Sequence, residues 1–248
     1  MRAPRALLTA AVGAATALLP VAALAQSVTL DLGGESSSTA RIVQIVLLMT
    51  VLSLAPAILV TVTSFTRIIV VLSFLRNALG IQQTPPNVVM ISLALFLTGF
   101  VMAPTLEAAY HDGLQPLMED KIGETEAATR ALAPLHAFML QHVRAQDLQL
   151  FADMAKIDHV ADAKETPLRV LVPSFMISEL RRAFEIGFLL FLPFLIIDMV
   201  VASILMSMGM MMLPPVTISL PFKIIFFVLV DGWYLVAGSL VQSFGPGG

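Results

Sequence analysis

The sequence of 248 residues contains no cysteine. This absence excludes disulfide bonds, thiolate metal sites and cysteine nucleophiles, and it leaves the redox compartment without an indicator. The four histidines, His111, His136, His142 and His159, lack the H-x-x-x-H spacing that holds a metal on one helix face. A glycine-rich phosphate loop and a G-x-S-x-G nucleophile turn are also missing. We therefore expect no enzyme activity, no metal and no cofactor.

Charged residues are few: 14 lysines and arginines and 17 aspartates and glutamates make up 12% of the chain, against roughly 25% in a typical soluble domain. Hydrophobic residues make up 58%. A water-soluble chain of this length needs more polar surface than these residues supply, whereas lipid can cover apolar surface. The net charge of -3, without a basic cluster, also argues against nucleic acid as a partner. The composition predicts a membrane protein.

Residues 1–25 have the three parts of a cleavable secretory signal peptide. Two arginines among the first five residues precede the apolar stretch Ala6 to Leu19, and the triplet ending at Ala25 fits the small-residue cleavage pattern. We expect Gln26 to be the mature N-terminus. The alternative is an uncleaved first transmembrane helix, which the many small alanines disfavour. Residues 26–41, rich in glycine and serine, are expected to be a flexible periplasmic arm.

Residues 42–106 predict a first apolar helical hairpin with spans from Ile42 to Phe65 and from Val88 to Leu106. The connection between them contains a glycine and two prolines, which end one helix and start the next. Arg67 and Arg76 are its only charged residues, so the positive-inside rule places this connection in the cytoplasm.

The long polar region 107–185 follows two spans, so we expect it to form a helical domain in the periplasm. Apolar residues recur there at helical spacing, with Phe138 beside one stripe and Phe151 in a second helix. Two interpretations of these aromatics stay open, a core within the chain and an interface with another subunit.

Residues 186–248 predict a second apolar hairpin, with spans Ile186 to Met208 and Val216 to Phe244. The whole chain is thus expected to be all-α, with about four apolar spans and a helical periplasmic domain.

Three charged residues fall inside the second hairpin, where charge is costly in hydrocarbon. Asp198 lies in its first span, and Lys223 and Asp231 lie in its second, eight residues apart and so near one helix face. Folding the hairpin about Met212 brings Asp198 and Lys223 to a similar depth and predicts an ion pair between them. The pair is either structural, which we favour, or part of a proton relay in an ion-coupled carrier. The first two spans contain no acidic residue or histidine to continue such a relay.

Glu179 lies beside Arg181 and Arg182 at the edge of an apolar segment. A solvated helix start would explain these charges, but their density also suggests that Glu179 bridges to a basic residue on an adjacent chain.

The segment from Gly209 to Pro215 contains the methionine triplet Met210, Met211 and Met212 between a glycine and two prolines. Methionine runs usually fill a membrane core, but the flanking residues predict a non-helical loop here. Methionine is flexible and polarisable, so a ring of such side chains can close around objects of different shape and seal against water.

Three runs of the sequence carry a family resemblance, PSFMISELRRAFEIGF from Pro173, PFLIIDMVVASILMSMGMMMLPP from Pro193 and LPFKIIFFVLVDGW from Leu220. A fourth is TSFTRIIVVLSFLRNALGIQQTPPN from Thr63. Over residues 42–244 the chain resembles the FliP/SctR family of type III secretion export gates, and the runs favour its flagellar branch.

The resemblance implies a pore-forming subunit of the flagellar protein export gate in the bacterial inner membrane, at the basal body. It implies several copies, usually five, assembled with FliQ, FliR and FlhB around a conduit for unfolded flagellar proteins. It also implies that Met210, Met211 and Met212 form a gasket in the closed pore. The helices of such a gate pack as tilted hairpins raised toward the periplasm, and hydropathy does not distinguish these from lipid-facing spans. A small ion-coupled carrier using Asp198, Lys223 and Asp231, or a passive scaffold, is the alternative.

Overall fold

The computed structural model describes residues 38–81, 83–157, 166–210 and 212–245, and these residues form helices and turns but no strand. The expected all-α fold is confirmed. The elements are α2 (Ser38–Val62), α3 (Phe65–Ala78), α4 (Asn87–Ala109), a π-helical turn (Tyr110–Leu114), α5 (Gln115–Met118), α6 (Glu124–His142), α7 (Ala145–Met154), α8 (Leu168–Ser207), α9 (Pro215–Leu229) and α10 (Gly232–Gln242). The chain divides into two units, residues 1–49 and 50–248, and the second contains every helix after α2. The expected cleavage site at Ala25 and Gln26 lies outside the described residues.

Two segments are long and apolar enough to cross a membrane, Asn87–Met118 and Leu168–Ser207. Two bent helical segments also pass this test, one within α2 and one formed by α9 and α10. The described residues therefore contain two candidate spans, or up to four, which agrees with the expectation of about four. The last expected span, Val216 to Phe244, is not one helix, because α9 and α10 meet at a break with a bend of 64°.

Helix α8 is 40 residues long and runs without a break past residues 185 and 186. At 1.5 Å per residue it extends about 60 Å, roughly twice the thickness of the hydrocarbon layer. We expected the polar domain to give way to the second hairpin at this point. The change from charged to apolar sequence instead falls inside one helix, so it does not mark a helix end.

A break between α2 and α3 divides what the sequence presents as one apolar stretch. The hydroxyl of Thr63 donates to the carbonyl of Leu59 at 2.6 Å, and that of Thr66 donates to the carbonyl of Val60 at 2.7 Å. Carbonyls in the last turn of a helix have no intrahelical partner, and the threonines satisfy two of them. The chain therefore stops α2 at Val62, and α3 begins at Phe65.

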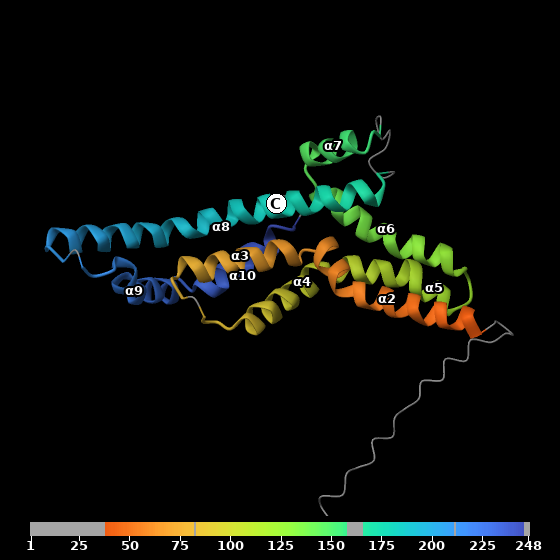
Figure 1. Cartoon of the computed structure of the whole chain (residues 1–248), viewed down its shortest axis with the longest axis horizontal. Coiled ribbons are helices and arrows are strands. Elements are labelled where there is room, and N and C mark those ends of the chain that lie inside the picture. Colours follow the sequence, from red (N-terminus) through yellow and green to blue (C-terminus); the bar gives the residue numbers. More distant parts are fainter. Residues whose placement is uncertain (1–37, 82, 158–165, 211, 246–248) are drawn as a thin grey trace, which may run out of the picture. The chain divides into compact units, whose positions relative to one another are not determined.

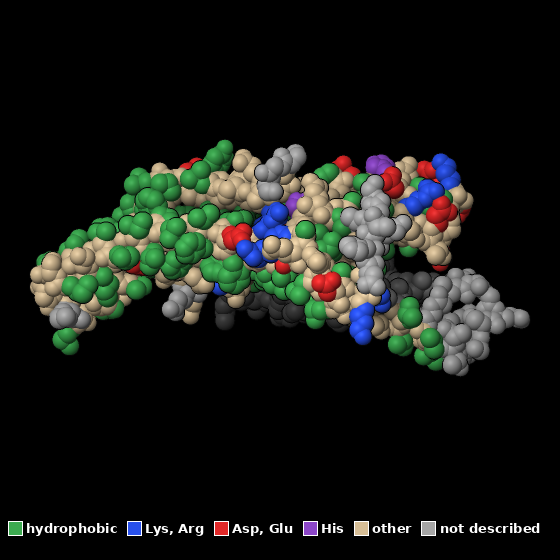
Figure 2. All heavy atoms as spheres, turned by 90° about the horizontal axis from the view of Figure 1, so that it is seen from above, with side chains coloured by type: hydrophobic (Ala, Val, Ile, Leu, Met, Phe, Trp, Pro, Cys, Tyr) green, Lys and Arg blue, Asp and Glu red, His purple; other side chains and the backbone are tan. Residues whose placement is uncertain are grey.

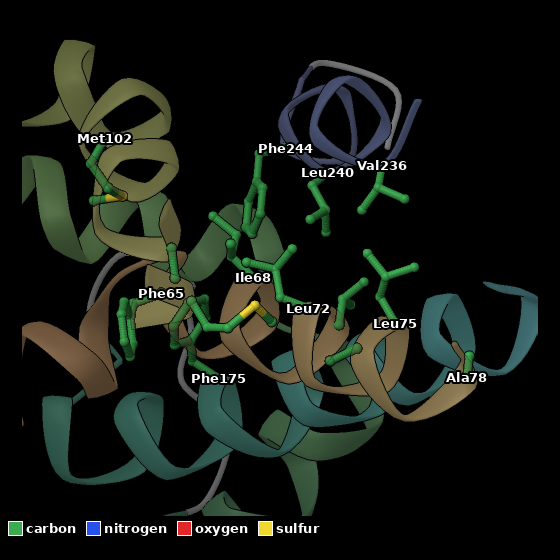
Figure 3. Close-up of a cluster of buried hydrophobic side chains, with 14 of the residues drawn as sticks. Phe65, Ile68, Leu72, Leu75, Ala78, Met102, Phe175, Val236, Leu240 and Phe244 are labelled. Atoms are coloured by element: carbon green, nitrogen blue, oxygen red, sulfur yellow. The ribbon is translucent and has the colours of Figure 1, made fainter. Parts of the chain in front are cut away.

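Helix α3 lies at the centre of the hydrophobic core and runs beside α8 (Figure 1). Its residues Ile68, Leu72 and Leu75 are at most 1% exposed and follow one helix face. Phe175 of α8 and Leu240 of α10 point toward them from two sides (Figure 3).

Gly187 of α8 lets α8 approach α3 closely. A Cβ at this position would lie 2.6 Å from the ring of Phe74 on α3, so a larger residue would force the two helices apart.

Large apolar side chains are exposed along α4, the second half of α8, and α9. Examples are Phe96 (79%) and Phe100 (71%) on α4, Leu189 (65%) on α8 and Leu229 (79%) on α9. Figure 2 shows hydrophobic side chains over the end of the molecule where α8 ends and α9 begins. Apolar surface of this extent requires lipid or another protein to cover it.

Candidate functional site

The methionine loop is the turn between α8 and α9, and its start has a fixed backbone geometry. Gly209 adopts φ +75°, its N–H donates to the carbonyl of Met206 at 3.1 Å, and the N–H of Met210 donates to the carbonyl of Leu205 at 3.0 Å. This pair of bonds is the Schellman motif that ends helices at a left-handed glycine. The predicted non-helical loop is present, and Pro215 then begins α9.

The side chains of this loop reach out from the hairpin. Met212 is 98% exposed and Met210 is 44% exposed, whereas Met211 lies outside the described residues. Because Met212 makes so few contacts, its thioether contributes little to packing within the chain.

The structure brings Asp198 of α8 and Lys223 of α9 together, between the two helices that this loop connects. The Nζ of Lys223 lies 2.6 Å from Oδ2 of Asp198, and the hydroxyl of Ser219 donates to Oδ1 of Asp198 at 2.5 Å. Lys223 also donates to the carbonyl of Ala78 at 3.1 Å, in the last turn of α3. A cation at a helix C-terminus is favourable because unpaired carbonyls gather there. The ion pair thus joins α8 and α9 to the end of α3.

Neutralising either member of this pair should destabilise the fold, and by different amounts. The side chain of Lys223 is 3% exposed and that of Asp198 is 22% exposed. Asp198→Asn leaves a buried ammonium without its carboxylate, so we expect a loss of about 3 kcal/mol in the free energy of unfolding. Lys223→Met should cost about 1–2 kcal/mol, because the carboxylate keeps Ser219 and some water. Denaturant titration of the purified protein measures both.

Exchanging the two charges should restore part of the stability that the single changes remove. The restoration is incomplete because an aspartate at position 223 would face the carbonyl of Ala78. Harmless single substitutions would show that the pair does not stabilise the fold.

Asp231 does not join this pair. It lies at the break between α9 and α10 with φ 49°, its N–H donates to the carbonyl of Val228 at 3.1 Å, and its own carbonyl accepts from Leu235 at 3.1 Å. No ion pair of Asp231 occurs among the residues that the structure describes. The expectation that it shares a helix face with Lys223 is wrong, because the helix ends between them. The Asp-Gly dipeptide is a turn signal that the sequence interpretation overlooked.

Glu179 forms a buried ion pair with Arg67 of the same chain. Nε and Nη2 of Arg67 lie 2.8 and 2.5 Å from the two carboxylate oxygens of Glu179. The two side chains are 1% and 0% exposed. Nη1 of Arg67 donates to the carbonyl and hydroxyl of Ser243 at 2.9 and 3.0 Å, and its Cζ lies 3.7 Å from the centroid of the Phe244 ring.

This pair corrects two sequence predictions. The expected bridge from Glu179 to an adjacent chain is replaced by one to Arg67, because packing of α3 against α8 brings the nearest guanidinium from within the chain. Arg67, which the sequence placed in a cytoplasmic connection, instead lies on the buried face of α3. The signal that could have identified it is an arginine within an apolar run, where an ionised group requires a partner.

Arg181 pairs with Glu185 one turn along α8, at 2.8 Å, and both side chains are more than half exposed. Such a pair contributes little to stability and leaves both groups accessible.

Phe138 is buried within the chain, contrary to a role at a subunit interface. It is 8% exposed, and its ring lies 6.0 Å from that of Phe175 and 6.2 Å from that of Phe244, centroid to centroid. The core interpretation therefore holds for Phe138. Phe151 of α7 is half-buried.

Comparison with known proteins identifies the family. The sequence profile of the FliP family matches residues 48–240. The chain belongs to the FliP family. Several relatives carry the name flagellar biosynthetic protein FliP. That of Caulobacter vibrioides is 62% identical over 237 residues, which cover 94% of this chain and 89% of the relative.

Two further relatives are somewhat less similar to this chain. FliP of Bacillus subtilis is 57% identical over 210 residues (85% of this chain, 95% of the relative), and FliP of Rhizobium meliloti is 56% identical over 199 residues (79% and 81%). The matched region of this FliP family member contains the methionine loop and the ion pairs Arg67–Glu179 and Asp198–Lys223. The sequence resemblance to the family is thus confirmed.

Proposed function

We propose that this FliP family member is a pore-forming subunit of the flagellar type III protein export gate in the bacterial inner membrane. Several copies, five by the family resemblance, assemble with FliQ, FliR and FlhB around a conduit through which unfolded flagellar proteins leave the cell. The relatives' shared name supports a role in building the flagellum. The apolar helices support a place in the membrane.

The observation that carries the pore role is the placement of Met212. This side chain is 98% exposed on a turn whose start is fixed by the hydrogen bonds after Gly209. A rigid hairpin that presents a flexible apolar side chain fits a seal, because sister copies can bring such side chains together around an axis. The exposed apolar faces of α4, α8 and α9 offer the area that such an assembly would bury.

The ion-coupled carrier receives no comparable support. Asp198 and Lys223 neutralise each other at 2.6 Å, and Asp231 is held at a helix break. A relay needs titratable groups in sequence along a path, and these three do not form one.

Photo-crosslinking from position 212 in flagellated cells tests the proposed function. A photoreactive amino acid in place of Met212 should form adducts with sister copies and, when export is stalled, with flagellar export substrates. The control position is Met118, which is 74% exposed in α5 and lies away from the loop. It should give no substrate adduct. Adducts from position 212 to lipid alone would refute the pore role.

A further inference from the structure

His142 is a buried histidine whose role the proposed export function does not explain. It is the last residue of α6 and is 4% exposed. Its Nδ1–H donates to the carbonyl of Phe138 at 2.8 Å, so the neutral ring carries its proton on Nδ1. A further proton would have to enter at Nε2.

The His142 ring lies where α6 meets the end of α10. Its centroid is 4.5 Å from that of Phe138 on α6 and 5.3 Å from that of Phe244, two residues beyond α10. The Phe244 ring also contacts the ring of Phe138 and the guanidinium of Arg67. His142 and Arg67 thus both contact Phe244, and together they hold the end of the chain's last described helix.

The charged groups around His142 come from neighbouring elements and largely cancel. Arg67 of α3 and Glu179 of α8 pair with each other, and Arg144 pairs with Asp147 of α7 at 3.1 Å. Residues 236–245, at the end of α10, contain no ionisable side chain. No carboxylate is therefore left free to stabilise an imidazolium at this position.

Burial lowers the pKa of His142 below its ordinary value, and the nearby charge of Arg67 acts in the same direction. Together they outweigh the opposing effects of the Phe138 carbonyl, of Glu179 and of the Phe244 carbonyl. The folded state therefore favours the neutral ring. Its stabilising effect is complete above the unfolded pKa of about 6.5 and is lost as the pH falls toward the lower folded value. Acid favours any state in which His142 reaches water.

We propose that His142 is an acid-sensitive latch: protonation of its ring weakens the packing of α6 against Phe244 and loosens the end of α10, which Arg67 still holds through Ser243. The change is local, because Arg67 and Glu179 still join α3 to α8. The latch depends only on contacts within the chain, so it stands independently of the proposed export function.

Hydrogen exchange measured by mass spectrometry tests the latch in the full-length protein in its membrane assembly. Residues 239–245 should exchange equally in wild type and His142→Gln at about pH 7.5. At about pH 5 they should exchange faster in wild type, by about tenfold for each unit between the folded and open pKa values of His142. Comparing variants at one pH cancels the intrinsic pH dependence of exchange. The substituted glutamine side chain keeps an N–H that can donate to the Phe138 carbonyl but does not titrate.

His111→Gln is the matched control, because it removes an exposed histidine and should leave the acid response of wild type unchanged. Equal exchange of wild type and His142→Gln at both pH values would overturn the proposal. If His142→Gln does not fold, the test compares two segments of the wild-type protein instead, residues 239–245 and α9. The proposal then fails if residues 239–245 lose no more protection on acidification than α9 does.

Discussion

Replacing Arg67 by methionine should lower the free energy of unfolding by about 3–5 kcal/mol, the largest stability loss that we expect from a single substitution in this chain. The change leaves the carboxylate of Glu179, which is 0% exposed, without either of its guanidinium contacts. It also removes the hydrogen bonds to Ser243 and the contact with Phe244. Denaturant titration of the purified protein in detergent micelles measures the loss.

Two matched variants separate the buried charge from lost packing. Arg67→Met combined with Glu179→Met should recover most of the stability, because two apolar side chains replace the pair without leaving a charge. Arg181→Met removes an arginine from an exposed pair on α8 and should cost less than about 1 kcal/mol. If Arg67→Met were as mild as Arg181→Met, the buried pair would not organise the core.

Composition and apolar runs were sufficient to predict an all-α chain with about four apolar spans, and the described residues contain two to four candidates. Both properties follow from the cost of exposing backbone and apolar side chains, and this cost does not depend on tertiary contacts. The Asp198–Lys223 pair was also predictable, because folding a hairpin about a known turn sets which residues share a depth.

Contacts between distant segments were not predictable in this way. Arg67 and Glu179 are 112 residues apart, and hydropathy does not show that α3 packs against α8. The break at Asp231 was missed because β-branched and aromatic residues around it continue the apolar pattern. Phe138 is buried partly by Phe244, which comes more than 100 positions later in the chain. The sequence around Phe138 therefore could not show whether it belongs to a core or to a subunit interface.

The proposed function predicts that replacing Met210, Met211 and Met212 together by alanine makes the assembled gate leak. Each substitution removes a thioether and leaves one methyl group, so sister loops can no longer close the conduit. We expect the flux of small ions to rise by about tenfold or more, which corresponds to about 1.4 kcal/mol removed from the barrier. Folding and assembly should persist, because Met212 is 98% exposed and supports no neighbour within the chain.

The central claim is that the methionine loop seals a conduit, and ion flux through reconstituted vesicles tests it most directly. The experiment compares wild type, the triple alanine variant and a control with Met118→Ala and Met154→Ala, two methionines that are 74% and 71% exposed elsewhere. The account predicts that only the triple variant leaks, at an unchanged amount of assembled complex. An intact barrier in the triple variant would contradict it.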